Sequence, residues 1–170
     1  MGQQPCFMAN EYYEPGERRA AKVKDLFARI ARRYDLINDL QSFWLHRGWK
    51  RRVVRLAKPA PGLRALDVCC GTGDLALALA REGAEVTGID FSEPMLEVAR
   101  GRIQSKVQVQ FLHGDAQRLP FPEDSFDIVT IGYGLRNLVD WETGLTEMRR
   151  VARPGGRLLV LEFGKPQNSL

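Results

Sequence analysis

After position 62, short apolar runs alternate with longer amphipathic segments along the 170-residue chain. The apolar runs are β-prone, which is typical of strands buried on both faces of a parallel sheet. The segments between them are rich in helix formers. This rhythm predicts an α/β fold with strands at 64–70, 85–89, 107–112, 126–131 and 157–163 and helices at 73–82, 92–103 and 140–151.

The first sixty residues have a different pattern. Residues 1–16 show no apolar periodicity, so we expect a mostly disordered leader. Residues 17–34 and 42–58 each place apolar side chains on one helical stripe and basic side chains on the other faces. The Pro-Ala-Pro-Gly sequence at 59–62 then breaks the chain. We therefore expect a leader at 1–16, a basic helical cap at 17–60 and a ligand-binding domain at 61–170.

A glycine turn follows the first predicted strand. Residues 71–73, Gly-Thr-Gly, precede a run of helix formers that starts at Asp74. Such a turn aims backbone N–H groups at a ligand beyond the carboxyl end of the strand. Two alternatives share this composition. Gly71, Gly73 and Ala76 satisfy the G-x-G-x-x-G/A pattern of dinucleotide sites, and an ordinary turn needs no ligand.

Charge separates the two ligand interpretations. A pyrophosphate prefers a positive helix N-terminus, whereas Asp74 occupies that place here and Asp67 lies just upstream. S-adenosylmethionine carries a sulfonium and an ammonium group, so acidic surroundings favour it over NAD. We therefore expect S-adenosylmethionine as the cofactor, with an NAD-dependent oxidoreductase as the alternative.

Acidic residues follow the next two strands. Asp90 lies 19 residues beyond Gly71, close to the spacing at which a carboxylate accepts both ribose hydroxyls. Asp115 ends the third strand, where it can accept from an adenine amino group. The alternatives are a helix cap for Asp90, although Ser92 suits that position better, and a turn residue for Asp115. Because carboxyl ends of parallel strands meet at one sheet edge, we expect both carboxylates beside the glycine turn.

A second glycine-rich stretch, Gly-Tyr-Gly-Leu-Arg-Asn at 132–137, follows the fourth strand. It contains no carboxylate to compensate Arg136, so we expect this arginine to bind an oxyanion. The alternative is an ion pair with a helix end. His46 and His113 are candidate general bases, although a lone histidine is more often structural. The Pro-Gly-Gly sequence at 154–156 indicates a structural turn.

Composition narrows the class of protein. The apolar fraction of 44% and charged fraction of 27% are those of a globular domain, and no apolar run is long enough to span a bilayer. Cys69 and Cys70 are adjacent in a predicted strand, so we expect small buried side chains in a reducing cytoplasm rather than a disulfide framework. With two histidines and no C-x-x-C pair, no metal site is expected.

Charge is spread unevenly along the chain. Residues 18–58 hold thirteen Lys/Arg and three Asp/Glu, a balance of +10, whereas the remaining residues have a balance of −6. Such asymmetry indicates an anionic partner, either membrane headgroups or nucleic acid, or else a solvated helix face. The basic segment lacks the interleaved aromatic residues that stack on nucleic-acid strands, so we expect no nucleic-acid partner.

Seven stretches between positions 23 and 166 share their residues with one known family. They are LFARIARRYDLIN at 26–38, Ser42 with His46-Arg47 and Trp49-Lys50, LDVCCGTGDL at 66–75, Asp90-Phe91-Ser92 with Met95-Leu96, Gly114-Asp115-Ala116 with Leu119-Pro120-Phe121, GLRN at 134–137 and RVARPGGRLLVLEF at 150–163. On these stretches the chain resembles the ubiquinone/menaquinone biosynthesis C-methyltransferase family, a branch of the class I S-adenosylmethionine-dependent methyltransferases. The glycine turn identifies only the superfamily, whereas the stretches at 26–38 and 134–137 are specific to this branch.

The resemblance implies a Rossmann-like class I methyltransferase fold, with a parallel sheet of order 3-2-1-4-5, helices on both faces and an amino-terminal helical cap. It also implies S-adenosylmethionine contacts at Thr72, Asp90, Asp115, Ala116 and Gly132. Many relatives have serine at position 132, so a side-chain contact is expected to be lost there. With the glycine-turn residues, the expected cofactor site is Asp67, Gly71, Thr72, Gly73, Asp90, Asp115, Ala116 and Gly132.

By the same resemblance, we expect methyl transfer to a ring carbon of a prenylated quinol, either demethylmenaquinol or a benzoquinol of ubiquinone synthesis. The Cys69-Cys70 loop is closer to the menaquinone-type members. Arg136 is expected to stabilise the developing phenolate, while Tyr133 and Asn137 shape the pocket. We expect the basic helices to cover the site and to rest on the inner face of the cytoplasmic membrane, and we consider a homodimer.

The family continues past the position of residue 166, and its sheet has a sixth and a seventh strand with a covering helix. We therefore expect a partial chain with an uncovered apolar edge at 158–161. The alternative from another class is a non-catalytic remnant that binds the cofactor or partner subunits.

Overall fold

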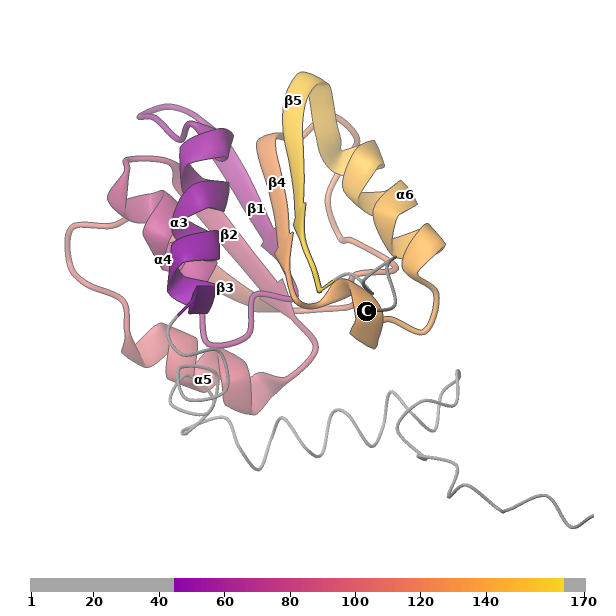
Figure 1. Cartoon of the computed structure of the whole chain (residues 1–170), viewed down its shortest axis with the longest axis horizontal. Helices are drawn as coiled ribbons and strands as arrows, with labels where there is room; N and C mark the ends of the chain where they lie inside the picture. The colour runs from indigo at the N-terminus through magenta and orange to yellow at the C-terminus, as the bar shows by residue number, and fades with distance from the viewer. Residues whose placement is uncertain (1–44, 164–170) are drawn as a thin grey trace, which may run out of the picture.

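Five parallel strands form one sheet in the order β3-β2-β1-β4-β5 (Figure 1). The structure is a computed structural model and describes residues 45–163. Its strands are β1 (Arg64–Val68), β2 (Glu85–Asp90), β3 (Val109–His113), β4 (Phe126–Gly132) and β5 (Ala152–Leu161). Its helices are α3 (Leu45–Ala57), α4 (Asp74–Arg81), α5 (Glu93–Gly101) and α6 (Trp141–Val151), with a 3₁₀ turn η2 (Leu135–Asn137). The expected fold class and strand order are confirmed. The expected leader and the expected helix at 17–34 lie outside the described residues.

Apolar layers cover both faces of the sheet. Ala65 of β1 packs with α3, α4 and α5, whereas its neighbours Leu66 and Val68 pack with α6 and the loop before β4. Because both faces of β1 are buried, its sequence is nearly continuous in apolar residues rather than alternating. Asp67 is the exception among its buried residues, and the alternation of side chains along the strand directs it to the α4 side.

Helix α3 is joined to the sheet as well as to α4. Helix α3 lies beside α4 (Figure 1), and Val53 and Ala57 are buried in the layer that the two helices share. Arg157 of β5 donates to the Ala57 carbonyl over 3.0 Å, and so satisfies one of the unpaired carbonyls at the helix C-terminus. The basic segment that the sequence separates from the domain is therefore packed on it, at least from residue 45 onward.

The end of β1 and the start of β5 differ from the predicted bounds. β1 stops at Val68, and Cys69 adopts a left-handed φ of 53° instead of continuing the strand. Cys70 is buried as expected, whereas Cys69 is half-buried in the turn after β1 and is not the strand residue that was expected. β5 begins at residue 152, five positions before the predicted start.

A bulge explains the longer β5. Phe126 pairs with Ala152 and Ile128 pairs with Arg157, so residues 153–156 lie opposite the single residue Asp127. The Asp127 carboxylate accepts from the Arg153 guanidinium over 2.9 Å and from the Arg64 amide over 2.8 Å. The turn expected at 154–156 is therefore an irregularity inside a strand, held by one carboxylate.

Further along β5, Leu158 and Val160 are 40% and 42% exposed. Both side chains lie on the outer strand of the sheet, next to β4 only. An apolar edge at 158–161 was expected, and these two residues supply its exposed part.

Candidate functional site

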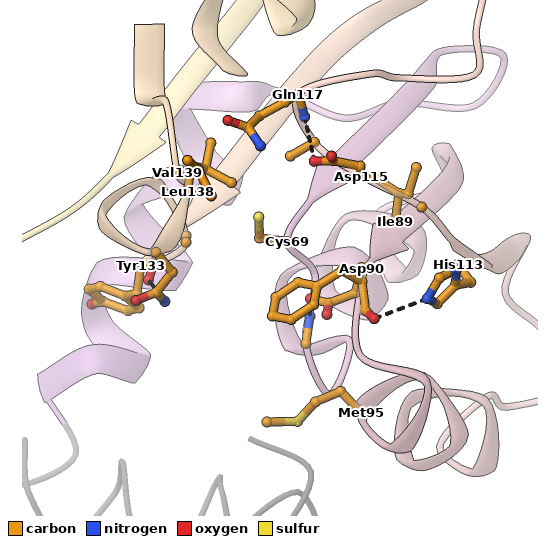
Figure 2. A pocket seen from close by; sticks show the side chains of 17 residues that line it. Cys69, Ile89, Asp90, Met95, His113, Asp115, Gln117, Tyr133, Leu138 and Val139 are labelled. Carbon is orange, nitrogen blue, oxygen red and sulfur yellow. Dashed lines mark hydrogen bonds between the residues drawn. The ribbon is translucent and has the colours of Figure 1, made fainter. Parts of the chain in front are cut away.

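A cavity of about 280 Å³ opens at the carboxyl ends of β1, β2, β3 and β4 (Figure 2). Four loops that are distant in sequence form its walls, because parallel strands bring their carboxyl ends to one edge. Seven of the expected site residues line it: Gly71, Asp90, Asp115, Ala116, Gly132, Tyr133 and Asn137. Four expected residues do not line it: Asp67, Thr72, Gly73 and Arg136.

Of the two carboxylates that line this cavity, Asp90 accepts more hydrogen bonds than Asp115. Its two oxygens accept from the Gly71 amide over 2.8 Å and from the Ser92 amide over 2.9 Å. Burial raises the pKa of Asp90, and the two amide bonds act against that rise. Each carboxylate oxygen keeps a further lone pair, so Asp90 can still accept from two ribose hydroxyls. Ser92 stands at the N-cap of α5, but its hydroxyl makes no capping bond, contrary to expectation.

Asp115 and Asn137 also line the cavity. One oxygen of Asp115 accepts from the Gln117 amide over 2.9 Å, so this residue does form the turn that was weighed as the alternative. Its side chain is nevertheless exposed at the cavity, where the other oxygen remains an acceptor. The side-chain NH2 group of Asn137 donates to the Tyr133 backbone carbonyl over 3.4 Å and stabilises the loop after β4.

Asp67 points into the sheet rather than into the cavity. It is 1% exposed and accepts from the Ala76 amide of α4 over 3.1 Å and from the Thr130 hydroxyl of β4 over 2.8 Å. Burial raises the pKa of Asp67 to about 7, although these bonds and Lys50 act in the opposite direction. The carboxyl group thus joins α4 to the sheet beneath the glycine turn, and a direct cofactor contact is not what this orientation offers.

Asp74 also departs from the expected electrostatics. Its carboxylate binds Lys50 of α3 over 2.8 Å and Arg102, just after α5, over 2.5 Å. Burial acts to raise the pKa of Asp74, but Lys50 and then Arg102 outweigh it, so the pKa is lowered. Because two cations compensate this carboxylate, it cannot be the group that repels a pyrophosphate. The charge argument for S-adenosylmethionine therefore rests on Asp90 and Asp115 alone.

The cations that bind Asp74 also hold the glycine turn at 71–73. Arg102 donates to the Thr72 carbonyl over 2.9 Å as well as to Asp74. Thr72 is 2% exposed and lines a small enclosed space of about 40 Å³ beside Asp67 and Lys50, not the larger cavity. Cations from α3 and from the segment after α5 therefore hold this turn from outside.

A phenyl ring fixes the turn from inside. A side chain on Gly73, whose φ is +81°, would place a Cβ 2.7 Å from the Phe111 ring. A Cβ on Gly88 of β2 would lie 2.6 Å from the same ring. Phe111 of β3 therefore packs directly against the backbone of the glycine turn at Gly73 and of β2 at Gly88. This close approach requires glycine at both positions.

Arg136 is compensated, contrary to expectation. Its guanidinium pairs with the Glu162 carboxylate just beyond β5, and its amide donates to the same carboxylate over 3.2 Å. The alternative of an ion pair was correct, although the partner follows a strand rather than ending a helix. The guanidinium lies 5.9 Å from the centroid of the cavity-lining Tyr133 ring. Arg136 is thus one side chain away from the cavity.

Sequence reasoning missed the apolar part of the wall, which includes Ile89, Met95, Leu138 and Val139. In Figure 2, Met95 and Val139 lie on opposite sides with Cys69 between them. Burial raises the pKa of the Cys69 thiol well above its usual range, so this group is neutral. The signal available was that each of these residues lies within five positions of an expected polar site residue.

His113 is a histidine of this cavity. The His113 ring lines the cavity with Nε2 3.0 Å from the Phe91 carbonyl, whereas the side chain of His46 lies outside what is described. Among residues 45–163, no group of three or more His, Cys, Asp or Glu side chains is placed to hold a metal ion. The cavity combines two carboxylates with an apolar wall, which suits an organic cation with an apolar substrate beside it.

Comparison with known proteins identifies relatives of this chain. The model of the ubiE/COQ5 methyltransferase family matches residues 16–170. A demethylmenaquinone methyltransferase of Staphylococcus aureus (strain MRSA252) is 47% identical over 148 residues, which are 85% of this chain and 61% of that protein. The chain therefore spans about three-fifths of the length of the curated relatives it matches.

Solved structures share the fold. YcgJ from Bacillus subtilis superposes with a TM-score of 0.66 at 33% identity, over 70% of this chain and 52% of that one. A structure described as a putative methyltransferase from Bacillus halodurans C-125 gives 0.64 at 30% identity, also over 70% and 52%. The sheet is thus the Rossmann-like methyltransferase type. Because the family model spans nearly the whole sequence, the chain belongs to the ubiE/COQ5 methyltransferase family.

Proposed function

We propose that the protein transfers a methyl group from S-adenosylmethionine to a ring carbon of a prenylated quinol, with demethylmenaquinol as the first substrate to test. The observation that carries this proposal is the 47% identity to a demethylmenaquinone methyltransferase across most of the chain. The cavity described above supports it, because two carboxylates and an apolar wall meet there. A benzoquinol of ubiquinone synthesis is the second substrate of the same chemical class.

S-adenosylmethionine supplies an electrophilic methyl group on its sulfonium. In our proposal, Asp90 accepts from the ribose hydroxyls and Asp115 accepts from the adenine amino group. Gly71 and Gly132 let the backbone approach the cofactor closely. A Cβ on Gly132 would meet only the Leu75 side chain at 3.7 Å, so position 132 has room for the serine of many relatives.

The quinol must lose a hydroxyl proton so that negative charge reaches the ring carbon that is methylated. We assign the stabilisation of that charge to Arg136, with Tyr133 and Asn137 positioning the ring. Arg136 stands behind Tyr133 and is paired with Glu162, so this role requires the guanidinium to reach past the tyrosine. Glu162 would then control when the positive charge is available.

We also propose that α3 contacts the inner face of the cytoplasmic membrane. The helix contains five Lys or Arg and no Asp or Glu, and it exposes Trp49 (38%) and Leu56 (54%). Basic residues beside exposed Trp and Leu are typical of helices that lie at a bilayer interface. None of the described helices is long and apolar enough to cross a membrane. Unchanged binding to anionic liposomes after charge removal at Arg51, Arg52 and Arg55 would contradict this contact. Homodimer formation stays a prediction, which sedimentation equilibrium can check.

The test of the reaction has two stages. Calorimetry should show binding of S-adenosylmethionine, and Asp90→Asn should weaken it by about 10- to 100-fold, because a ribose acceptor loses its charge. Methyl transfer to a demethylated prenyl naphthoquinol should then be followed by mass spectrometry. Binding without turnover would favour the non-catalytic remnant, and preferential binding of NADH would favour the oxidoreductase.

A further inference from the structure

We propose that a row of three aromatic side chains, Trp49, Phe163 and Tyr133, forms the seat of the isoprenoid chain of the substrate. The row begins at the cavity and ends on the outer surface of α3. This inference rests on the proposed function, because it concerns how the prenyl group of that quinol leaves the cavity.

The three rings are in contact with one another. Tyr133 lines the cavity and is 8% exposed. Phe163 stacks on it with ring centroids 4.8 Å apart and an angle of 21° between the planes. The Trp49 ring meets the Phe163 ring edge-on, with centroids 5.7 Å apart. The row therefore runs without a break from the wall of the cavity to the first turns of α3.

The outer two rings are partly exposed, although the Arg136 guanidinium lies 5.5 Å from the centroid of the Phe163 ring. Phe163 is 57% exposed and Trp49 is 38% exposed. Exposed apolar rings side by side are costly in water and mark a place where apolar surface is covered. Trp141, by contrast, is 52% exposed and contacts no other aromatic ring within residues 45–163. The structure thus separates an aromatic row that touches the cavity from an isolated exposed tryptophan.

An isoprenoid chain fits this row better than a polar ligand. Isoprene units are apolar, branched and flat at each double bond, so they pack against ring faces and are attracted mainly by removal from water. The row also ends on α3, the helix with five basic residues that we place at the membrane surface. A chain lying along the row would pass from the cavity to the bilayer in which its remainder is dissolved.

The experiment compares two ligands on three variants. The ligands are a naphthoquinone with two isoprene units and the same naphthoquinone without them, each titrated calorimetrically in the presence of S-adenosylhomocysteine. Phe163→Ala and Trp49→Ala should weaken binding of the prenylated ligand by about tenfold and leave the tailless ligand within about twofold, because neither side chain lines the cavity that would hold the quinone ring. Trp141→Ala, a matched exposed tryptophan outside the row, should change neither.

Two further measurements keep a folding defect from imitating this result. Affinity for S-adenosylmethionine should be the same in all variants, and Phe163→Leu, which keeps an apolar surface, should recover most of the affinity for the prenylated ligand. Equal losses of affinity for both ligands, or no loss for either, would contradict the proposed role of the aromatic row. A change in sedimentation coefficient on Phe163→Ala would also contradict it, because the rings would then contact a second copy of the chain instead of the isoprenoid chain. If the wild-type protein binds neither quinone, the proposed function itself fails, and the seat fails with it.

Discussion

Lys50 of α3 and Asp74, the first residue of α4, form a 2.8 Å ion pair that connects the amino-terminal helix to the glycine turn. The side chains are 17% and 23% exposed, and Arg102 holds the other carboxylate oxygen. The pair therefore transmits the position of α3 to the loop that forms one wall of the cavity.

Replacing Lys50 by methionine should lower the free energy of unfolding by about 1 kcal/mol, since the pair is only partly screened by water. It should also weaken binding of S-adenosylmethionine several-fold, because the glycine turn loses one of its two cations. Urea denaturation and calorimetry measure the two effects. Arg52→Met, an exposed cation on the same helix, is the control and should change neither quantity beyond about 0.5 kcal/mol. Equal effects of both substitutions would show that only the total charge of α3 matters.

The buried Asp67 predicts a pH dependence of stability. Its pKa rises from 3.8 to about 7 on folding, so between these values the unfolded state is ionised while the folded state keeps the proton. The contribution of this residue to stability is therefore complete below about pH 4 and is lost as the pH rises through 7, by about 1.4 kcal/mol per pH unit in between.

Asp67→Asn removes this titration. The side-chain oxygen of the asparagine can still accept from the Ala76 backbone N–H, and its NH2 group can donate to the Thr130 hydroxyl oxygen. The difference in unfolding free energy between wild type and variant, measured by denaturation from pH 5 to 8, should shift in favour of the variant as the pH rises. A difference that stays constant over this range would mean that Asp67 is already ionised in the folded protein at pH 5.

Arg136 can be tested against a closely matched arginine. Arg136→Gln should reduce kcat by about 10²- to 10³-fold if the guanidinium stabilises the phenolate, with little change in the affinity for S-adenosylmethionine. Arg153 is the control, because it is also paired with a carboxylate and its side chain is 43% exposed against 45% for Arg136. Arg153→Gln should leave kcat within about twofold. A similar decrease in both variants would remove Arg136 from the reaction.

The close packing of Phe111 on Gly88 predicts a steric penalty. Gly88→Ala should destabilise the protein by about 1–3 kcal/mol, because the new Cβ would lie 2.6 Å from the ring. Combining it with Phe111→Leu should cost less than the sum of the two single changes. Gly48→Ala provides the opposite control, because nothing lies within 4 Å of a Cβ on that helical residue and alanine should stabilise α3 by about 0.5–1 kcal/mol. Thermal unfolding of the four variants checks these expectations.

Sequence reasoning succeeded where one local pattern decides the outcome. Apolar runs such as the one in β1 predicted the strands, and the rule that parallel strands end at one edge brought Asp90 and Asp115 to the same cavity. It failed for contacts between distant segments. The direction of Asp67 depends on which face of β1 receives α4, and the pairing of Arg136 with Glu162 spans 26 positions. Neither follows from spacing within one stretch. The bulge opposite Asp127, which makes β5 longer than predicted, was missed for the same reason, because it depends on how β4 and β5 pair.

The bond between Arg157 and the Ala57 carbonyl joins residues 100 positions apart. During synthesis, α3 therefore leaves the ribosome long before the strand that receives its carboxyl end. Until then its tryptophan and its five basic residues are held by fewer contacts than in the finished fold. The part of its docking that depends on β5 can therefore form only after residue 157 has been synthesised.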